Sequence, residues 1–133
     1  MSYGVEKLYE LLNDPTITTL LDTYTDGASN TLPAIFYDEV IPSNVPDSVQ
    51  KTINFYRASP IDGGLEYLDI GYTVNCRGAI KLDAENIQKA VFDIVNRYNK
   101  DTYFLKASIL PNISPANDRD NYNAPLEVQI KTK

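Results

Sequence analysis

Side chains that could bind a cation gather in the stretch "NDRDNYN" near the end of the chain. Asp118 and Asp120 stand two positions apart, and Asn117 and Asn123 flank them. Carboxylate and amide oxygens are the ligands that Ca²⁺ takes in proteins. The stretch lacks the glycine and the distal glutamate of the twelve-residue calcium loop. We therefore interpret it as a polar loop rich in turn residues, with a calcium site as the alternative.

Neighbouring carboxylates could supply a general acid and a general base, as they do in glycoside hydrolysis. Asp38 and Glu39 are adjacent on a predicted strand, so their side chains face opposite sides of the sheet and cannot share one substrate. Three more acids, Asp62, Glu66 and Asp69, flank a predicted hairpin. We interpret these three as a solvated acidic edge, with an acid–base pair as the alternative.

Histidine is absent, and there is one cysteine, Cys76. The lack of histidine removes the usual general base at neutral pH and the commonest transition-metal ligand. Ser-His and Cys-His catalytic arrangements and the usual zinc sites are therefore excluded. Cys76 lies on the apolar phase of a predicted strand, so we expect a buried, inert thiol. No GxxxxGK[ST] or GxGxxG loop occurs. The sequence thus predicts a protein that is not an enzyme and has no cofactor or metal.

A chain of 133 residues, of which 43% are apolar, can bury one hydrophobic core, so we expect a single domain over residues 1–133. The 12 basic and 18 acidic side chains give a net charge of −6, which disfavours a nucleic-acid-binding surface. No apolar run approaches the roughly 20 residues that cross a bilayer. The start, "MSYGVEKLYELLND", lacks the pattern of a signal peptide. We expect a cytosolic protein without membrane contact.

Helical periodicity predicts a short N-terminal helix and one long helix. The first, Val5–Leu12, should end before Pro15, because the residue before a proline is pushed out of the α region. Asp14 is placed to cap a second short turn that begins at Pro15. The long helix covers Ala84–Tyr98 with a continuous apolar stripe, and Asp83 is placed to cap it.

Five strands are predicted, either from the alternation of apolar and polar residues or from a high content of β-branched and aromatic residues. They cover residues 34–41, 52–58, 68–77, 103–110 and 126–131. The clearest has one apolar phase, formed by Leu68, Ile70, Tyr72, Val74 and Cys76. Its other phase should be solvated or face a partner, and consists of Asp69, Gly71, Thr73, Asn75 and Arg77. The order of elements predicts an α+β fold, with a mostly antiparallel sheet of about four to five strands and the long helix packed on one face.

Tyrosine is abundant, with 10 copies and no tryptophan. Several tyrosines fall on predicted outward strand positions or in predicted loops, including Tyr37, Tyr56, Tyr67 and Tyr122. The simpler explanation is that tyrosine fits a half-exposed pleated surface. The other is protein contact, because tyrosine is enriched at interfaces. The long polar loop 111–125 favours contact, since loops of that length in compact domains tend to be functional or disordered.

The order of these elements resembles a known family. The features in question are a short N-terminal helix, a proline-flanked strand ("LPAIFYDEV"), a strand leading into a long helix ("YTVNCRGAIKLDAENIQKAVFDIVNRY"), and a last pair of strands around a polar loop. Together they are similar to the tail terminator proteins, also called tail completion or minor tail proteins, of long-tailed bacteriophages and prophages. The similarity covers nearly the whole chain. It lies in the order, length and general sequence pattern of the elements and includes no catalytic signature.

The resemblance implies a structural virion protein that is assembled in the host cytoplasm. Such proteins form a ring, expected to be a hexamer, at the head-proximal end of the tail tube, where they end tube growth and join the tail to the neck. The partners would be copies of the chain itself, the tail tube protein and neck or connector proteins. The acidic net charge would suit a lumen through which DNA passes without specific binding.

Contacts in a closed ring are head-to-tail. We expect the hairpin at residues 61–65 and the loop at residues 112–124 to make them, through Asp62, Gly63, Gly64, Arg119 and Tyr122. Two other classes stay open. One is another virion joining protein, such as a head-tail connector, a stopper or a tail tube subunit. The other is a cytosolic small-ligand-binding or regulatory α+β domain, which would have a pocket with convergent polar groups.

Overall fold

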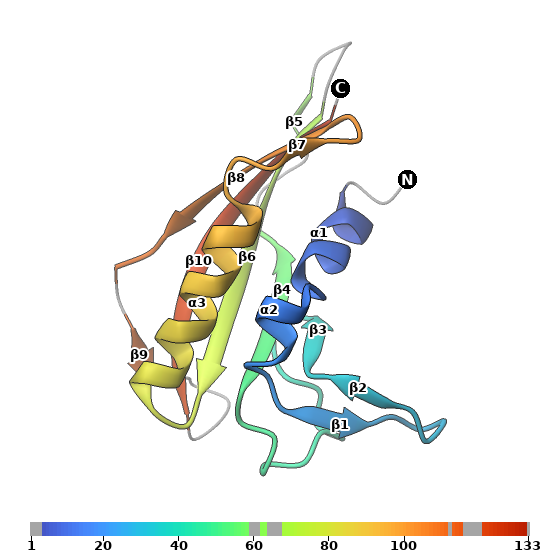
Figure 1. Cartoon of the computed structure of the whole chain (residues 1–133), viewed down its shortest axis with the longest axis vertical. Coiled ribbons are helices and arrows are strands. Elements are labelled where there is room, and N and C mark those ends of the chain that lie inside the picture. Colours follow the sequence, from blue (N-terminus) through green and yellow to red (C-terminus); the bar gives the residue numbers. More distant parts are fainter. Residues whose placement is uncertain (1–3, 59–61, 64–67, 112, 116–120, 133) are drawn as a thin grey trace.

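A mixed β-sheet with helices on one face forms the body of the molecule (Figure 1). The computed structural model describes residues 4–58, 62–63, 68–111, 113–115 and 121–132. In chain order, its elements are α1 (Val5–Leu12), α2 (Pro15–Thr18), β1 (Thr23–Thr25), β2 (Thr31–Pro33), β3 (Ile35–Tyr37), β4 (Thr52–Arg57), β5 (Asp62–Gly63), β6 (Leu68–Gly78), α3 (Lys81–Val95), β7 (Asn99–Lys100), β8 (Tyr103–Ile109), β9 (Ser114–Pro115) and β10 (Tyr122–Thr132).

The main sheet has eight strands, and its path runs β3-β4-β6-β10-β8-β7, with β5 pairing to β6 and β9 to β10. Its neighbouring strands are antiparallel except β3 and β4, which run parallel. The α+β class is confirmed, whereas the predicted number of four to five strands is too low. The three extra strands, β5, β7 and β9, have two residues each, too short to show a periodicity of their own in the sequence.

The stretch predicted as one strand over residues 34–41 is divided. β2 pairs with β1 in a separate hairpin, while β3 joins the main sheet. Ala34 lies at the corner between them: its N–H donates to Asp22 O at 3.0 Å, and its carbonyl accepts from Ile53 N at 2.9 Å. After Tyr37 the chain leaves the sheet and reaches β4 through residues 38–51, a connection long enough for a parallel pairing.

The long predicted helix lies three residues earlier than expected, at Lys81–Val95. Asp83 is not its N-cap but stands in the first turn, where the helix dipole still favours a carboxylate. The helix ends early because the backbone after it bonds to β8. Arg97 N donates to Leu105 O, and Leu105 N donates to Tyr98 O. A φ of 65° at Arg97 turns the chain toward that strand.

The N-terminal elements agree with the prediction. α1 occupies Val5–Leu12, and α2 begins at Pro15. The side chain of Asp14 accepts a hydrogen bond from Thr16 N at 2.9 Å, so the predicted cap is confirmed.

The strand β10 begins earlier than predicted, since it has 11 residues and pairs along the whole of β6. The predicted loop 111–125 is correspondingly shorter, and β9 within it also pairs with β10. Pro125 fits inside the strand because its carbonyl accepts from Leu110 N, which places its ring nitrogen on the β8 side. The β8–β10 ladder ends beside this position, at Ile109, so the N–H that proline lacks is missing at the end of the ladder and not in its middle.

The main core lies between the helices and the sheet. α1 and α3 cover one face, as Figure 1 shows. The predicted apolar phase of β6 is buried beneath them at its four described side chains, Ile70, Tyr72, Val74 and Cys76. A second, smaller cluster lies on the opposite face and consists of Ala34, Phe36, Ile41, Val45 and Val49. Because Phe36 is in register with Asn54, whose side chain points away from the helices, this cluster covers one end of that face.

Candidate functional site

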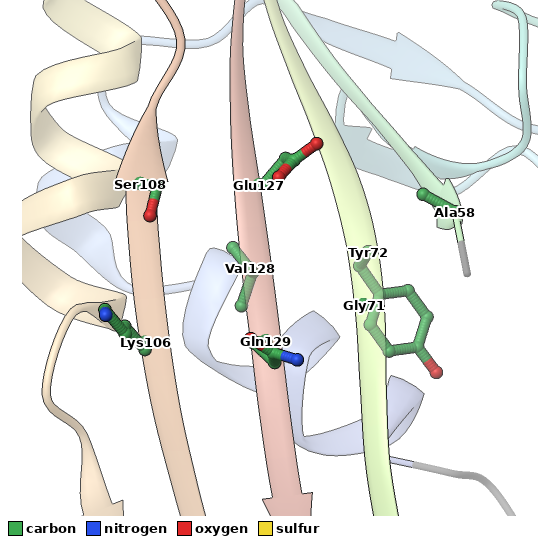
Figure 2. Close-up of a pocket in the computed structure, with 8 residues that line it drawn as sticks. All are labelled: Ala58, Gly71, Tyr72, Lys106, Ser108, Glu127, Val128 and Gln129. Carbon is green, nitrogen blue, oxygen red and sulfur yellow. The ribbon is translucent and has the colours of Figure 1, made fainter. Parts of the chain in front are cut away.

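The face of the sheet opposite the helices, which we call the open face, is exposed along β8 and β10 and half-buried along part of β6; Figure 2 shows residues of this region. In this view the helices lie behind the strands. The exposed side chains of Lys106, Ser108, Glu127 and Gln129 stand on the open face. The register places Gly71, Gln129 and Lys106 in one row across the three strands. The open face is therefore polar and lies on the most extensively paired part of the fold.

A hollow of about 250 Å³ lies on this face between the end of β4 and β8. Gly71 has no side chain at its outward position, and Ala58, whose N–H donates to Gly71 O at 2.9 Å, has a small one. Glu127, Gln129 and Lys106 form much of the rim. Small-ligand pockets usually have roughly 300–1,000 Å³ and mostly apolar walls. The Gly71 hollow is smaller and polar, and so suits a contact surface better than a ligand pocket.

Opposite charges are balanced on the described part of the open face. Glu127 and Asp69 carry carboxylates, and Lys106 and Lys131 carry ammonium groups. Lys131 Nζ lies 3.9 Å from Asp69 Oδ2. A surface that binds nucleic acid needs a basic patch or stripe. The balance of charge on β6, β8 and β10 does not provide one.

The outward phase of β6 is not solvated along its whole length, contrary to the prediction. Asn75 is 7% exposed and Arg77 is 4% exposed. Arg77 Nε donates to Asn54 Oδ1 at 2.9 Å. Asn54 Nδ2 in turn donates to the carbonyls of Asp38 and Glu39 at 3.0 and 3.1 Å. A buried guanidinium is costly unless it is hydrogen-bonded, and these amides help to meet that need.

Two further amides extend these contacts, which we call the amide network, toward β10. Asn123 Nδ2 donates to Asn75 Oδ1 at 3.0 Å, and Asn121 Nδ2 reaches Gln50 O at 3.5 Å. The network therefore bonds to the connection 38–51 near both of its ends. It fastens this connection to the sheet, and with it the acidic pair that follows β3.

An ion-pair cluster ties α1 to the turn between β7 and β8. Lys7 Nζ lies 2.9 Å from Glu10 Oε2 and 3.2 Å from Asp101 Oδ2. The hydroxyl of Tyr98 donates to the same Asp101 oxygen at 3.2 Å. The hydrogen bond with Glu10, and after it the one with Asp101, raises the pKa of Lys7 above its ordinary value. The bonds from Lys7 and Tyr98 lower the pKa of Asp101.

The predicted contact residues do not come together. Asp62 and Gly63 form β5, where Asp62 is in register with Asp69. Tyr122 is the first residue of β10, at the opposite end of the long β6–β10 ladder, and not part of a loop as predicted. Its ring lies 5.6 Å from Lys81 Nζ. Gly64 and Arg119 lie outside the described residues.

The residues proposed for chemistry are also dispersed. Asp38 and Glu39 lie in the connection after β3 and not on a strand. Asp118 and Asp120 fall outside the described residues, as do Asn117 and Glu66. Within the described part of the chain, no group of three or more acidic, cysteine or histidine residues could hold a metal ion.

Cys76 is fully buried, as predicted. Burial raises the pKa of its thiol far above the ordinary value, which keeps it protonated and unreactive at neutral pH. Burial also raises the pKa of Tyr72 to about 12. Neither group can act as a nucleophile or base near pH 7.

Two of the tyrosines singled out in the sequence, Tyr37 and Tyr56, line one groove at the β3 edge of the sheet. Tyr37 is 52% exposed, and its ring centroid lies 5.2 Å from that of Phe55. Tyr56 is half-buried beside it. Tyr67 lies outside the described residues. The sequence analysis placed Tyr37 on an outward phase, but its register with the buried Phe55 places it on the core phase, and its ring is exposed because β3 is an edge of the sheet.

The sequence matches no model of a protein family and no curated protein. Seven chains of solved structures match the fold. One of them belongs to the structure described as the virion of the native gene transfer agent (GTA) particle. The likeness covers 94% of this chain and 90% of that chain, with a TM-score of 0.58 and 12% sequence identity. The two chains share a fold. Over the part of the chain that the structure describes, no helix has the length and apolar character needed to span a bilayer.

Proposed function

We propose that this chain is a structural protein of a virion and that it acts by assembly, without catalysis. The observation that carries the proposal is the likeness in fold to a chain of the gene transfer agent virion, because it extends over nearly the full length of both chains.

Within that role we propose a tail terminator. Copies of the chain would form a ring, a hexamer as the resemblance implies, at the head-proximal end of a tail tube. The ring would end tube growth and join the tail to the neck, after assembly in the host cytoplasm. Its partners would be the tail tube protein and neck or connector proteins.

In such a ring, DNA would pass through the lumen without specific binding. The net charge of −6 supports this proposal, because phosphates are not held by acidic walls. The balanced open face is also compatible with a lumen lining, since its lysines are matched by carboxylates. Mapping charges onto an assembled ring tests the proposal, and a basic lumen would contradict it.

Pull-down experiments test the specific role. The chain, immobilised at low density, is mixed separately with purified tail tube protein and purified portal protein from the same genome. A terminator should retain tube protein, and negative-stain images should show it at one end of each tube. Retention of portal protein alone would instead identify a connector or stopper, and co-polymerisation along the tube would identify a tube subunit.

The Gly71 hollow keeps a small-ligand-binding domain as a second candidate. Such a domain would remain a monomer or dimer at high concentration and would bind a metabolite. Native mass spectrometry of the protein purified from cells, with a bound small molecule and no higher oligomer, would favour this candidate over the virion protein.

A further inference from the structure

We propose that the two sides of the main sheet are complementary, and that the Ile109 end of β8 of one copy binds at the Tyr37 end of the β3 edge of the next. The inference rests on the proposed function, because it names the surfaces with which copies would close a head-to-tail ring.

One row of side chains crosses the whole sheet and is apolar from end to end. The register aligns Tyr37, Phe55, Val74, Leu126 and Ile109 in that order. The three inner members are fully buried, whereas Tyr37 is 52% exposed and Ile109 is 46% exposed. This row of side chains therefore ends in a solvent-exposed apolar side chain at each side of the sheet. When two copies meet edge to edge, these two side chains can cover each other.

The backbone is oriented for pairing along β3 and, on β8, at its Ile109 end. Ile53 N donates to Ala34 O, so by alternation Ile35 and Tyr37 direct their N–H and C=O groups away from β4. On β8, the side away from β10 is already bonded within the chain at Leu105 and Ala107, since Leu105 N donates to Tyr98 O and Ala107 N to Asn96 Oδ1.

By the same alternation, Ile109 directs its backbone groups to that outer side of β8. The chain of antiparallel and parallel pairings across the sheet leaves β3 and β8 running in opposite directions. Ile109 placed beside Tyr37 of another copy would therefore meet it in antiparallel sense.

Charge is complementary between the two edges. Asp38 and Glu39 follow β3 directly and are exposed, while Lys106 is exposed on β8. If Tyr37 pairs with Ile109 of the next copy, the antiparallel register sets Asp38 opposite Ser108 and diagonal to Lys106, within reach of an ion pair.

The β3 edge also has room for an incoming strand. An open groove of about 660 Å³ lies there, lined by Tyr37, Asp38, Glu39, Val40, Tyr56 and Arg57. Its walls combine apolar rings with carboxylates. A strand end that carries both lysine and apolar side chains, as β8 does with Lys106 and the exposed Ile109, suits such a groove.

Disulfide trapping tests the contact directly. The double variant Tyr37→Cys/Ile109→Cys, oxidised in solution, should give a ladder of cross-linked multimers on non-reducing gels, because directly opposed strand residues lie about 5.5 Å apart at Cα and can form a disulfide. The native Cys76 is buried and does not interfere. Each single variant should give no ladder. The control Tyr37→Cys/Lys89→Cys, with an exposed partner on α3, should give none either.

Charge reversal provides a second test that does not depend on cysteine chemistry. Asp38→Lys should weaken self-association about tenfold, which corresponds to about 1.4 kcal/mol, and so should Lys106→Asp. The double reversal should restore association to within about threefold of the original chain. Asp93→Lys, an exposed change on α3, is the control and should leave association unchanged.

The outcomes separate this inference from the proposed function. Multimers that form without the 37–109 cross-link and ignore both charge reversals would overturn the edge contact and leave the virion role intact. A chain that stays monomeric, alone and in the presence of tail tubes, would overturn both. A ladder together with rescue by the double reversal would establish the contact, whichever virion component the ring then binds.

Discussion

The Asn54→Ala substitution tests whether the amide network holds the connection 38–51 on the sheet. It removes the acceptor of Arg77 Nε and the donor of two bonds to the carbonyls of Asp38 and Glu39. The bond to the guanidinium contributes about 1.5–3 kcal/mol, and each neutral bond about 0.5–1.5 kcal/mol. We therefore expect the free energy of unfolding to fall by about 3–4 kcal/mol, a large part of the 5–15 kcal/mol that is typical of a domain.

Urea denaturation followed by circular dichroism measures this loss, and the m-value should stay unchanged if the native fold persists. Hydrogen exchange adds a local readout. Val45 N and Val49 N bond to carbonyls within the same connection, so their protection should fall in the variant. Asn86→Ala, an exposed change on α3, is the control and should alter stability by less than about 0.5 kcal/mol. A loss below about 1 kcal/mol in Asn54→Ala, with protection unchanged, would refute the anchoring role of the network.

Three further predictions address packing, charge and the thiol. Gly78→Ala would place its Cβ 2.7 Å from a side-chain carbon of α3, so unfolding measurements should show a loss of about 1–3 kcal/mol, whereas Gly27→Ala, with no atom within 4 Å, should lose less than about 0.5 kcal/mol. Lys7→Met should remove the contribution of the Lys7–Asp101 ion pair to the stability of the fold. That contribution is fully present above the ordinary carboxyl pKa of about 3.9, and it is lost as the pH falls through the lowered pKa of Asp101. Thermal melts of the two proteins should therefore converge toward pH 2, and a constant gap would contradict the ion-pair cluster. Because burial raises the pKa of the Cys76 thiol, iodoacetamide at pH 8 should modify only the unfolded protein, and rapid labelling of the native protein in mass spectra would show an accessible thiol.

Periodicity predicted the elements that pack most regularly. The apolar phase of β6 was correct at each of its described side chains, because a strand with one face in the core repeats every two residues. The cap at Asp14 was correct because capping depends on residues within one turn. The end of α3 was predicted wrongly, because Arg97 and Tyr98 bond to Leu105 of a later strand. Local helix propensity contains no information about that partner.

The errors at the candidate site have the same origin. Asn75 and Arg77 were expected to be solvated because their residue types are polar, yet the connection 38–51 covers them, and Asn54 satisfies the guanidinium from another strand. Tyr122 was placed in a loop because turn-forming residues and Pro125 follow one another there. Proline is tolerated in β10 because its nitrogen faces the end of the β8–β10 ladder and not its middle, which is a property of the sheet and not of the local sequence.

Assembly is the central claim, and light scattering of the purified chain coupled to size-exclusion chromatography tests it most directly. The account predicts a discrete oligomer whose mass is a fixed multiple of 14.9 kDa, sixfold for the proposed hexamer, and ring-shaped particles in negative stain. A species of 14.9 kDa that persists at high concentration and leaves tail tubes uncapped would contradict it.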